Sequence, residues 1–163
     1  MSIIKIIIIT IVTGIVLFIL MLVYALWPKI RDVSRDKGLS PFLNKPLTLK
    51  RMAVLYFGKD AEYRFKNYSI NERYELPHEK EYGLAAGHSI TLKNFKTYTN
   101  SAGSGFTYLY GLGETTLPSG EKVEFEYDWG SVDESIYGRE VVELPLAPWQ
   151  DSTETKIKFR YNK

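Results

Sequence analysis

Three acidic residues alternate along one short segment and are the residues best spaced to do chemistry. Glu124, Glu126 and Asp128 are separated by single residues within the sequence VEFEYDW. Paired carboxylates can act as general acid and base, or can bind calcium. Side chains two residues apart on a strand lie about 7 Å apart, which is too far for tight chelation without further ligands. The pattern therefore favours the solvated face of a strand over a catalytic pair.

Histidine, cysteine and glycine give little support to catalysis. The chain has two histidines, His78 and His88, and no spacing brings both onto one face. It has no cysteine, which excludes disulfides, thiolate catalysis and cysteine-based zinc sites. The paired glycines at 103/105 and 111/113 are not followed by the Gly-Lys-Ser/Thr that a phosphate-binding loop needs. We therefore expect no enzyme activity, no bound metal and no small-molecule cofactor.

One enzymatic alternative stays open. Carboxylates and tyrosines of a β-domain could converge in a cleft, with Glu124, Glu126, Glu143 or His88 as the reacting groups. Such a membrane-anchored enzyme would show these side chains in one pocket with displaced pKa values.

Aromatic residues offer a second kind of site, one that binds. The chain contains 12 Tyr, 8 Phe and 3 Trp, a composition that favours strands. Most of these rings belong to a core, but an exposed subset would form a surface for a protein partner. The predicted surface consists of Tyr98, Tyr108, Tyr110 and Trp149.

An uncharged N-terminal stretch must hold this domain in place. Residues 6–27 carry no charge, and Ile6, Leu17 and Trp27 mark the start, middle and end of the stretch. As a helix it would reach about 33 Å, enough to cross a bilayer core of about 30 Å. A signal peptide usually has a shorter apolar core of about 7–15 residues, although residues 23–25 match a cleavage rule. We predict an uncleaved single-pass anchor over residues 1–28, in the lipid bilayer of a bacterial inner membrane.

The segment after the anchor is basic. Lys29, Arg31, Arg35 and Lys37 follow within ten residues of the apolar stretch. This excess favours a cytoplasmic C-terminal domain, with a periplasmic one as the alternative. Residues 29–46 are predicted to form either a charged juxtamembrane linker or a short interfacial helix.

Residues 47–163 have the pattern of an all-β domain. Strands are expected near 47–57, 62–68, 72–76, 89–99, 105–113, 122–129, 139–144 and 155–161. In the segment 122–129, Val123, Phe125, Tyr127 and Trp129 alternate with acidic residues, which predicts one buried face. The strand 155–161 alternates with basic residues instead, so we expect the two strands to pair. The predicted fold is a small antiparallel β-barrel or sandwich.

A faint repeat suggests smaller units within this domain. Leu47-Thr-Leu-Lys50 recurs as Ile90-Thr-Leu-Lys93, which divides the domain into sub-repeats 47–86 and 87–163. Within the second, Ala86-Gly-His-Ser89 leads into ITLKNF, an aromatic hairpin and VEFEYDWG. Residues 86–130 thereby resemble small barrels of the Src-homology-3-like type. That resemblance implies one or two such barrels, and a binding module more than an enzyme.

The charge balance excludes a nucleic-acid partner and points to a protein. Residues 38–163 carry 16 Lys/Arg and 17 Asp/Glu, so the domain is about neutral and lacks a basic footprint for nucleic acid. The sequence therefore predicts a membrane-anchored protein-interaction module. It could be an accessory subunit of a membrane or envelope complex, or a bacterial immunity-type protein that captures a toxin.

Overall fold

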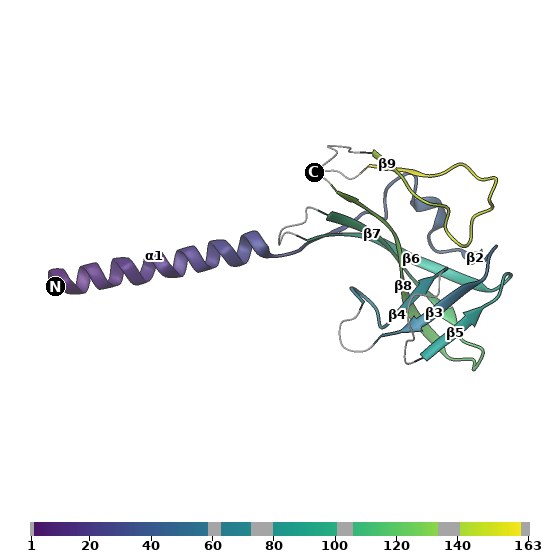
Figure 1. Ribbon diagram of the computed structural model, residues 1–163, viewed down its shortest axis with the longest axis horizontal. Helices are drawn as coiled ribbons and strands as arrows, with labels where there is room; N and C mark the ends of the chain where they lie inside the picture. The colour runs from purple at the N-terminus through teal and green to yellow at the C-terminus, as the bar shows by residue number, and fades with distance from the viewer. Residues whose placement is uncertain (1, 59–62, 73–79, 101–105, 134–140, 161–163) are drawn as a thin grey trace.

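One long N-terminal helix precedes a β-rich domain in the computed structural model (Figure 1). The structure describes residues 2–58, 63–72, 80–100, 106–133 and 141–160. Helix α1 runs over Ile3–Leu26, contains 24 residues, and projects away from the domain with its side chains exposed. Its length and composition suit a single membrane span or a signal sequence, so the predicted apolar helix is confirmed. Ile6, Leu17 and Trp27 lie at its start, in its middle and at its C-cap.

Within the described residues, ten strands form one open sheet and one separate hairpin. The main sheet has eight strands in the order β1-β6-β7-β8-β4-β3-β5, with β2 also paired to β6, and β9 and β10 form the hairpin. The elements are β1 (Lys29–Asp32), η1 (Ser40–Phe42), β2 (Pro46–Thr48), β3 (Ala53–Phe57), β4 (Tyr68–Asn71), β5 (Lys80–Leu84), β6 (Ser89–Thr99), β7 (Phe106–Thr116), β8 (Lys122–Asp133), β9 (Val141–Glu143) and β10 (Lys158–Arg160).

The β-domain is confirmed, but the predicted antiparallel barrel is not. Among the described residues the sheet shows no closure, since β1 and β5 end its strand order without pairing to each other. The sheet is also mixed, because β4 pairs with β8 in parallel. The open path differs from the closed barrel implied by the Src-homology-3-like resemblance. The predicted sub-repeats 47–86 and 87–163 stay a prediction.

The segment after the helix joins the sheet. Residues 29–46, expected as a linker or interfacial helix, begin with strand β1, in which Lys29 pairs with Thr99 and Asp32 with Lys96. Leu39 of the same segment is fully buried in the core. Pro28 lacks an N–H and cannot continue a helix, so the chain extends directly into β1. Only residues 27 and 28 separate the end of α1 from the sheet.

The predicted pairing of strands 122–129 and 155–161 is wrong. Strand β8 pairs with β7 and β4, whereas β10 pairs with β9. The hairpin between β7 and β8 closes over a short turn in which Gly120 has φ +87°, so their pairing costs little loop entropy. The charged side chains that were expected to pair across these two strands have other partners. Glu124 forms an ion pair with Lys66, and Lys158 forms one with Glu143.

Trp129 is the centre of the core. Its ring is fully buried and lies 5.6 Å from Phe42, 5.6 Å from Phe95 and 5.3 Å from Trp149, centre to centre. Its indole Nε1 donates to the carbonyl of Pro145 at 2.8 Å, which satisfies its one polar group. Val123, Phe125 and Tyr127 are buried beside it, so the predicted buried face of this strand is confirmed.

Glycine lets β7 approach its neighbours closely. A Cβ on Gly113 would lie 2.5 Å from the Thr91 carbonyl oxygen and 2.8 Å from the Phe125 ring. Both distances are shorter than real contacts allow, so only glycine fits here. Gly113 therefore allows β7 to pack closely against β6 and β8.

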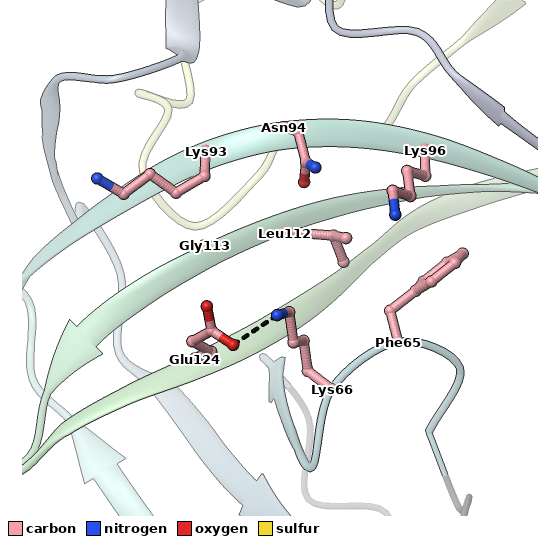
Figure 2. Close-up of a pocket in the computed structure, with 8 residues that line it drawn as sticks. All are labelled: Phe65, Lys66, Lys93, Asn94, Lys96, Leu112, Gly113 and Glu124. Atoms are coloured by element: carbon pink, nitrogen blue, oxygen red, sulfur yellow. Dashed lines mark hydrogen bonds and ion pairs between the residues drawn. The ribbon is translucent and has the colours of Figure 1, made fainter.

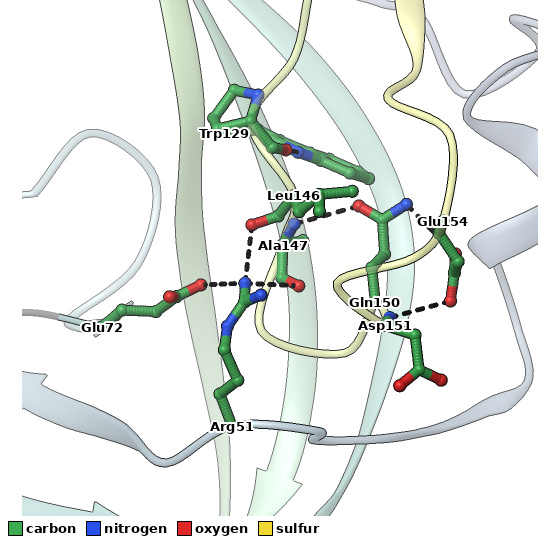
Figure 3. A network of polar contacts seen from close by, with 9 residues as sticks. Arg51, Glu72, Trp129, Leu146, Ala147, Gln150, Asp151 and Glu154 are labelled. Atoms are coloured by element: carbon green, nitrogen blue, oxygen red, sulfur yellow. Dashed lines mark hydrogen bonds and ion pairs between the residues drawn. The ribbon is translucent and has the colours of Figure 1, made fainter.

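Arg51 holds the C-terminal segment over this core (Figure 3). Its Nη2 donates to the carbonyls of Leu146 at 2.8 Å and Ala147 at 3.0 Å, and pairs with Glu72 at 2.8 Å. Gln150 Oε1 accepts from the Ala147 amide, which tightens the same turn. This arrangement places residues 144–150 firmly on one side of the sheet.

Candidate functional site

The candidate site lies on the other side of the sheet, away from Trp129. Side chains alternate across a strand, so the buried Phe95 and Leu109 face the core while Lys96 and Tyr110 face outward. We call this side of β6, β7 and β8 the outer face.

Four aromatic residues of β6 and β7 line up on the outer face. Tyr98 and Tyr108 are cross-strand neighbours, and the Tyr108 ring lies 6.3 Å from both Phe106 and Tyr110. The guanidinium of Arg64 lies 4.6 Å from the centre of the Tyr98 ring, which is a cation–π contact. We call Tyr98, Phe106, Tyr108 and Tyr110 the tyrosine row.

The structure brings together three of the four predicted surface residues. Tyr98 and Tyr108 are half-buried and present part of their rings to solvent. Tyr110 belongs to the same row but is only 6% exposed, because the Phe65 ring packs edge-on against it at 5.3 Å. Trp149 does not join them, since it is 5% exposed and packs in the core on the opposite side. Whether this row contacts a partner stays a prediction.

Burial raises the pKa of the Tyr110 hydroxyl well above its usual range. The negative charges of Asp128 and Glu126 raise this pKa further, while Arg64 acts in the opposite direction. The Tyr110 hydroxyl therefore keeps its proton at physiological pH.

A short loop, residues 63–67, lies on the outer face, and one buried carboxylate holds it there. Glu126 is 3% exposed and accepts three backbone N–H groups, from Arg64 at 3.1 Å, Phe65 at 2.6 Å and Lys66 at 3.0 Å. Charge-assisted bonds of this kind are about twice as strong as neutral ones. Glu126 thus fixes the loop that carries Phe65 and Lys66.

An irregularity in β6 places two polar residues on the outer face. Its pairing with β7 shifts between Leu92 and Asn94, so Lys93 is an extra residue in the strand. Bulges of this kind re-aim side chains and often lie next to functional sites. Here Leu92 and Phe95 both remain in the core, while Lys93 and Asn94 are turned outward together.

A groove with three lysines lies between this bulge and the loop (Figure 2). It encloses about 200 Å³. In Figure 2 the side chains of Asn94 and Lys96 on β6 point toward the strand β7, which forms the floor with Leu112 and has Phe65 and Lys66 on its other side, whereas Lys93 points along the sheet. We call this space the basic groove, and its lining residues are Phe65, Lys66, Lys93, Asn94, Lys96, Leu112, Gly113 and Glu124.

The lysines of the basic groove differ in their partners. Lys66 pairs with Glu124 at 2.5 Å, and Lys93 pairs with Glu114 at 2.9 Å. Lys96 has its Nζ 5.3 Å from the centre of the Phe65 ring, and its cross-strand neighbour is Asp32, whose pKa the Lys96 charge helps to lower. The groove therefore presents positive charge over an apolar floor.

Glu114 bridges two lysines at the rim of the groove. Hydrogen bonds from Lys122 and then Lys93 lower the pKa of its carboxyl group, so it stays ionised. Its negative charge offsets part of the positive charge of Lys93.

The groups of the enzymatic alternative lie in separate places. Glu126 holds the loop, Glu124 binds Lys66, Glu143 lies on the β9–β10 hairpin, and His88 Nε2 lies 2.7 Å from the Thr115 hydroxyl. In the part of the chain that the structure describes, no three His, Asp or Glu side chains group around a point where a metal could bind. His78 lies outside the described residues. The outer face gathers cations and aromatic rings beside Glu124 and Glu126.

Sequence reasoning missed most of the basic groove, although one signal was present. The spacing between apolar residues is two from Ile90 to Leu92 and three from Leu92 to Phe95. A step of three inside a strand indicates a bulge, and it would have identified Lys93 and Asn94. No comparable signal marks the contact between Glu126 and the loop, because the two are about sixty residues apart in the chain.

Comparisons with protein-family models, with curated proteins and with solved structures found no match for this chain.

Proposed function

We propose that this chain is a membrane-anchored protein-interaction module that binds a protein partner through the outer face of its sheet. The observation that carries the proposal is the tyrosine row, with the half-exposed Tyr98 and Tyr108 beside Arg64. Tyrosine and arginine are enriched at the energetic centres of protein interfaces, and tyrosine buries much surface at a low cost in conformational entropy.

The two sides of the sheet differ in availability. The C-terminal segment, held by Arg51, covers the core side. The outer face carries the loop 63–67, which buries Tyr110 but leaves Tyr98 and Tyr108 half-exposed. Among the described residues, no further element covers the tyrosine row, so a partner could reach it without displacing any of them.

The anchor supports the same function. Helix α1 as a membrane span would confine the domain to the bilayer surface and raise its effective concentration near membrane partners. The short connection through Trp27 and Pro28 would keep the sheet next to the bilayer. The exposed Lys29, Arg31, Arg35 and Lys37 favour a cytoplasmic domain, with the periplasm as the alternative.

Two roles fit this module. It could be an accessory subunit of a membrane or envelope complex, or an immunity-type protein that captures a toxin at the membrane. In either role recognition, not catalysis, is the activity.

Site-specific crosslinking tests the proposal. A photo-crosslinking amino acid is placed at Tyr98, at Tyr108 or, as a control, at the exposed Lys156, and intact membranes are irradiated. We expect one discrete adduct at both tyrosine positions, absent at Lys156 and lost when Arg64→Ala is added. An adduct of equal yield at all three positions, or at Lys156 alone, would overturn the proposal. Carbonate extraction and protease access in sealed vesicles test the anchor and its orientation in the same preparation.

A further inference from the structure

We infer that the basic groove receives acidic side chains of an extended segment of the protein partner. This inference rests on the proposed function and adds to it the chemistry of the partner. It is carried by Lys93, Asn94 and Lys96 on one wall, Phe65 and Lys66 on the other, and Leu112 on the floor.

The groove is held in shape before any ligand binds. The bulge in β6 turns Lys93 and Asn94 to the same side. The opposite wall is fixed by the bonds from Glu126 to the amides of Phe65 and Lys66. Binding to a preformed site avoids the cost of ordering loops.

Charge favours an anionic occupant. Three lysines and one carboxylate line the groove, and Asp32 lies outside this lining, opposite Lys96 on β1. The pairs Lys66–Glu124 and Lys93–Glu114 involve partly exposed side chains. Exposed pairs are worth at most about 1 kcal/mol, so a carboxylate of a ligand can replace either acidic partner.

Size favours a side chain over a cofactor. The groove encloses about 200 Å³, whereas sites for drug-sized ligands and cofactors usually enclose about 300–1,000 Å³. Leu112 and the Phe65 ring give its interior an apolar part. An aspartate or glutamate side chain supplies both a methylene stem and a carboxylate for such a space.

The surroundings favour a peptide over a free phosphate or a lipid headgroup. Phosphate sites usually use backbone N–H groups, and the three N–H groups of the loop are already bound to Glu126. Thr99 of β6 pairs with Lys29, which adjoins α1. Lys93 lies six residues before Thr99, which places Lys93 about 20 Å along β6 from the strand end that adjoins the helix. Phe65 also contacts Tyr110, which makes the groove continuous with the tyrosine row.

Peptide binding to the full-length chain tests the inference. The protein is placed in nanodiscs of phosphatidylcholine, and fluorescence anisotropy follows a labelled peptide of sequence Glu-Leu-Glu-Asp-Leu-Glu and its amide counterpart Gln-Leu-Gln-Asn-Leu-Gln. We expect the acidic peptide to bind about tenfold more tightly than the amide peptide, and to lose affinity as salt rises. The double variant K93Q/K96Q should lower its affinity about tenfold.

A matched control removes the same charge elsewhere. The variant K156Q/K158Q changes two exposed lysines of the C-terminal segment and should leave the affinity within about twofold. Equal binding of both peptides, or equal losses in the two double variants, would overturn the inference. Full displacement of the acidic peptide by 10 mM inorganic phosphate would also overturn it, by showing a site for small anions.

The two proposals can fail separately. A Tyr108 adduct that forms in membranes while the acidic peptide shows no preference would leave the proposed function standing and reject the groove. Preferential binding of the acidic peptide without a Tyr108 adduct would reject the tyrosine row as the docking surface.

Discussion

The two sides of the central sheet are built for different tasks. On the core side, Trp129 is fully buried and lies in contact with the rings of Phe42, Phe95, Tyr127 and Trp149. On the outer face, Tyr98 and Tyr108 are cross-strand neighbours and stay half-exposed. Aromatic residues therefore contribute stability on one side and accessible binding surface on the other.

On each side of the sheet, one charged side chain holds a covering segment in place through hydrogen bonds. Arg51 donates to two carbonyls of the C-terminal segment on the core side, and Glu126 accepts three N–H groups of the loop 63–67 on the outer face. In each case a charge satisfies backbone groups that would otherwise be buried without partners. The difference is that the segment held by Arg51 seals the core, whereas the segment held by Glu126 forms one wall of a groove.

Removing the central ring of the core should have the largest effect. Trp129→Ala is expected to lower the free energy of unfolding by about 3–5 kcal/mol, because it leaves a cavity among Phe42, Phe95 and Trp149. Urea denaturation measures this loss. The matched change Tyr108→Ala on the outer face should cost less than half as much, and equal losses would contradict the contrast between the two sides.

Removing the charge of Glu126 should release the loop without unfolding the core. Glu126→Gln is expected to cost about 2–3 kcal/mol, because the amide nitrogen of glutamine cannot accept from a backbone N–H. Hydrogen exchange at the amides of residues 64–66 should become faster, while the amides of β7 stay protected. Glu124→Gln is the control, since its exposed pair with Lys66 is worth at most about 1 kcal/mol. Unchanged exchange in Glu126→Gln would show that another contact holds the loop.

Arg51 should contribute less than Glu126. Arg51→Met keeps an apolar stem but removes the bonds to residues 146 and 147, with an expected cost of about 1–2 kcal/mol. The nearby Trp149 ring should report the change as altered tryptophan fluorescence. Lys50→Met, which removes only a 3.7 Å pair between exposed side chains, serves as the control and should have little effect.

Alkaline pH should lower the free energy of unfolding through one buried tyrosine on each side of the sheet. Burial raises the pKa values of Tyr110 and Tyr127 above their usual range. The folded protein therefore keeps protons that the unfolded chain releases near pH 10. Stability is full below pH 10 and falls above it, by about 1.4 kcal/mol per pH unit for each tyrosine. Urea denaturation between pH 9 and 11 should show a smaller decline for Tyr110→Phe than for the unchanged chain, and an identical decline would mean that Tyr110 is not buried.

Local patterns predicted much of the fold. The uncharged run predicted α1. The alternation of Val123, Phe125, Tyr127 and Trp129 predicted the buried side of β8, and Pro118-Ser-Gly120 predicted the turn before this strand. Each of these depends on neighbours within a few residues. Long-range pairing could not be predicted in the same way, and the parallel contact of β4 with β8 and the open order of the sheet were missed.

The candidate site was predicted in part. The period of two along residues 106–110 placed Tyr108 and Tyr110 on one strand side, and the predicted Tyr98 lies beside Tyr108 on the neighbouring strand. Trp149 follows two prolines in an irregular segment, where no period indicates which way a side chain points. The alternation along β8 predicts that Glu126 is solvated. Its burial could not be predicted from neighbouring residues, because the loop that covers it comes from a distant part of the chain.

The yield of the photo-crosslinked adduct at Tyr108, relative to that at Lys156, in intact membranes is the most direct test of the contrast between the two sides. Recognition through the outer face predicts a discrete adduct at Tyr108, none at Lys156, and loss of the adduct on Arg64→Ala. Equal adducts at both positions, or an adduct at Lys156 alone, would contradict it.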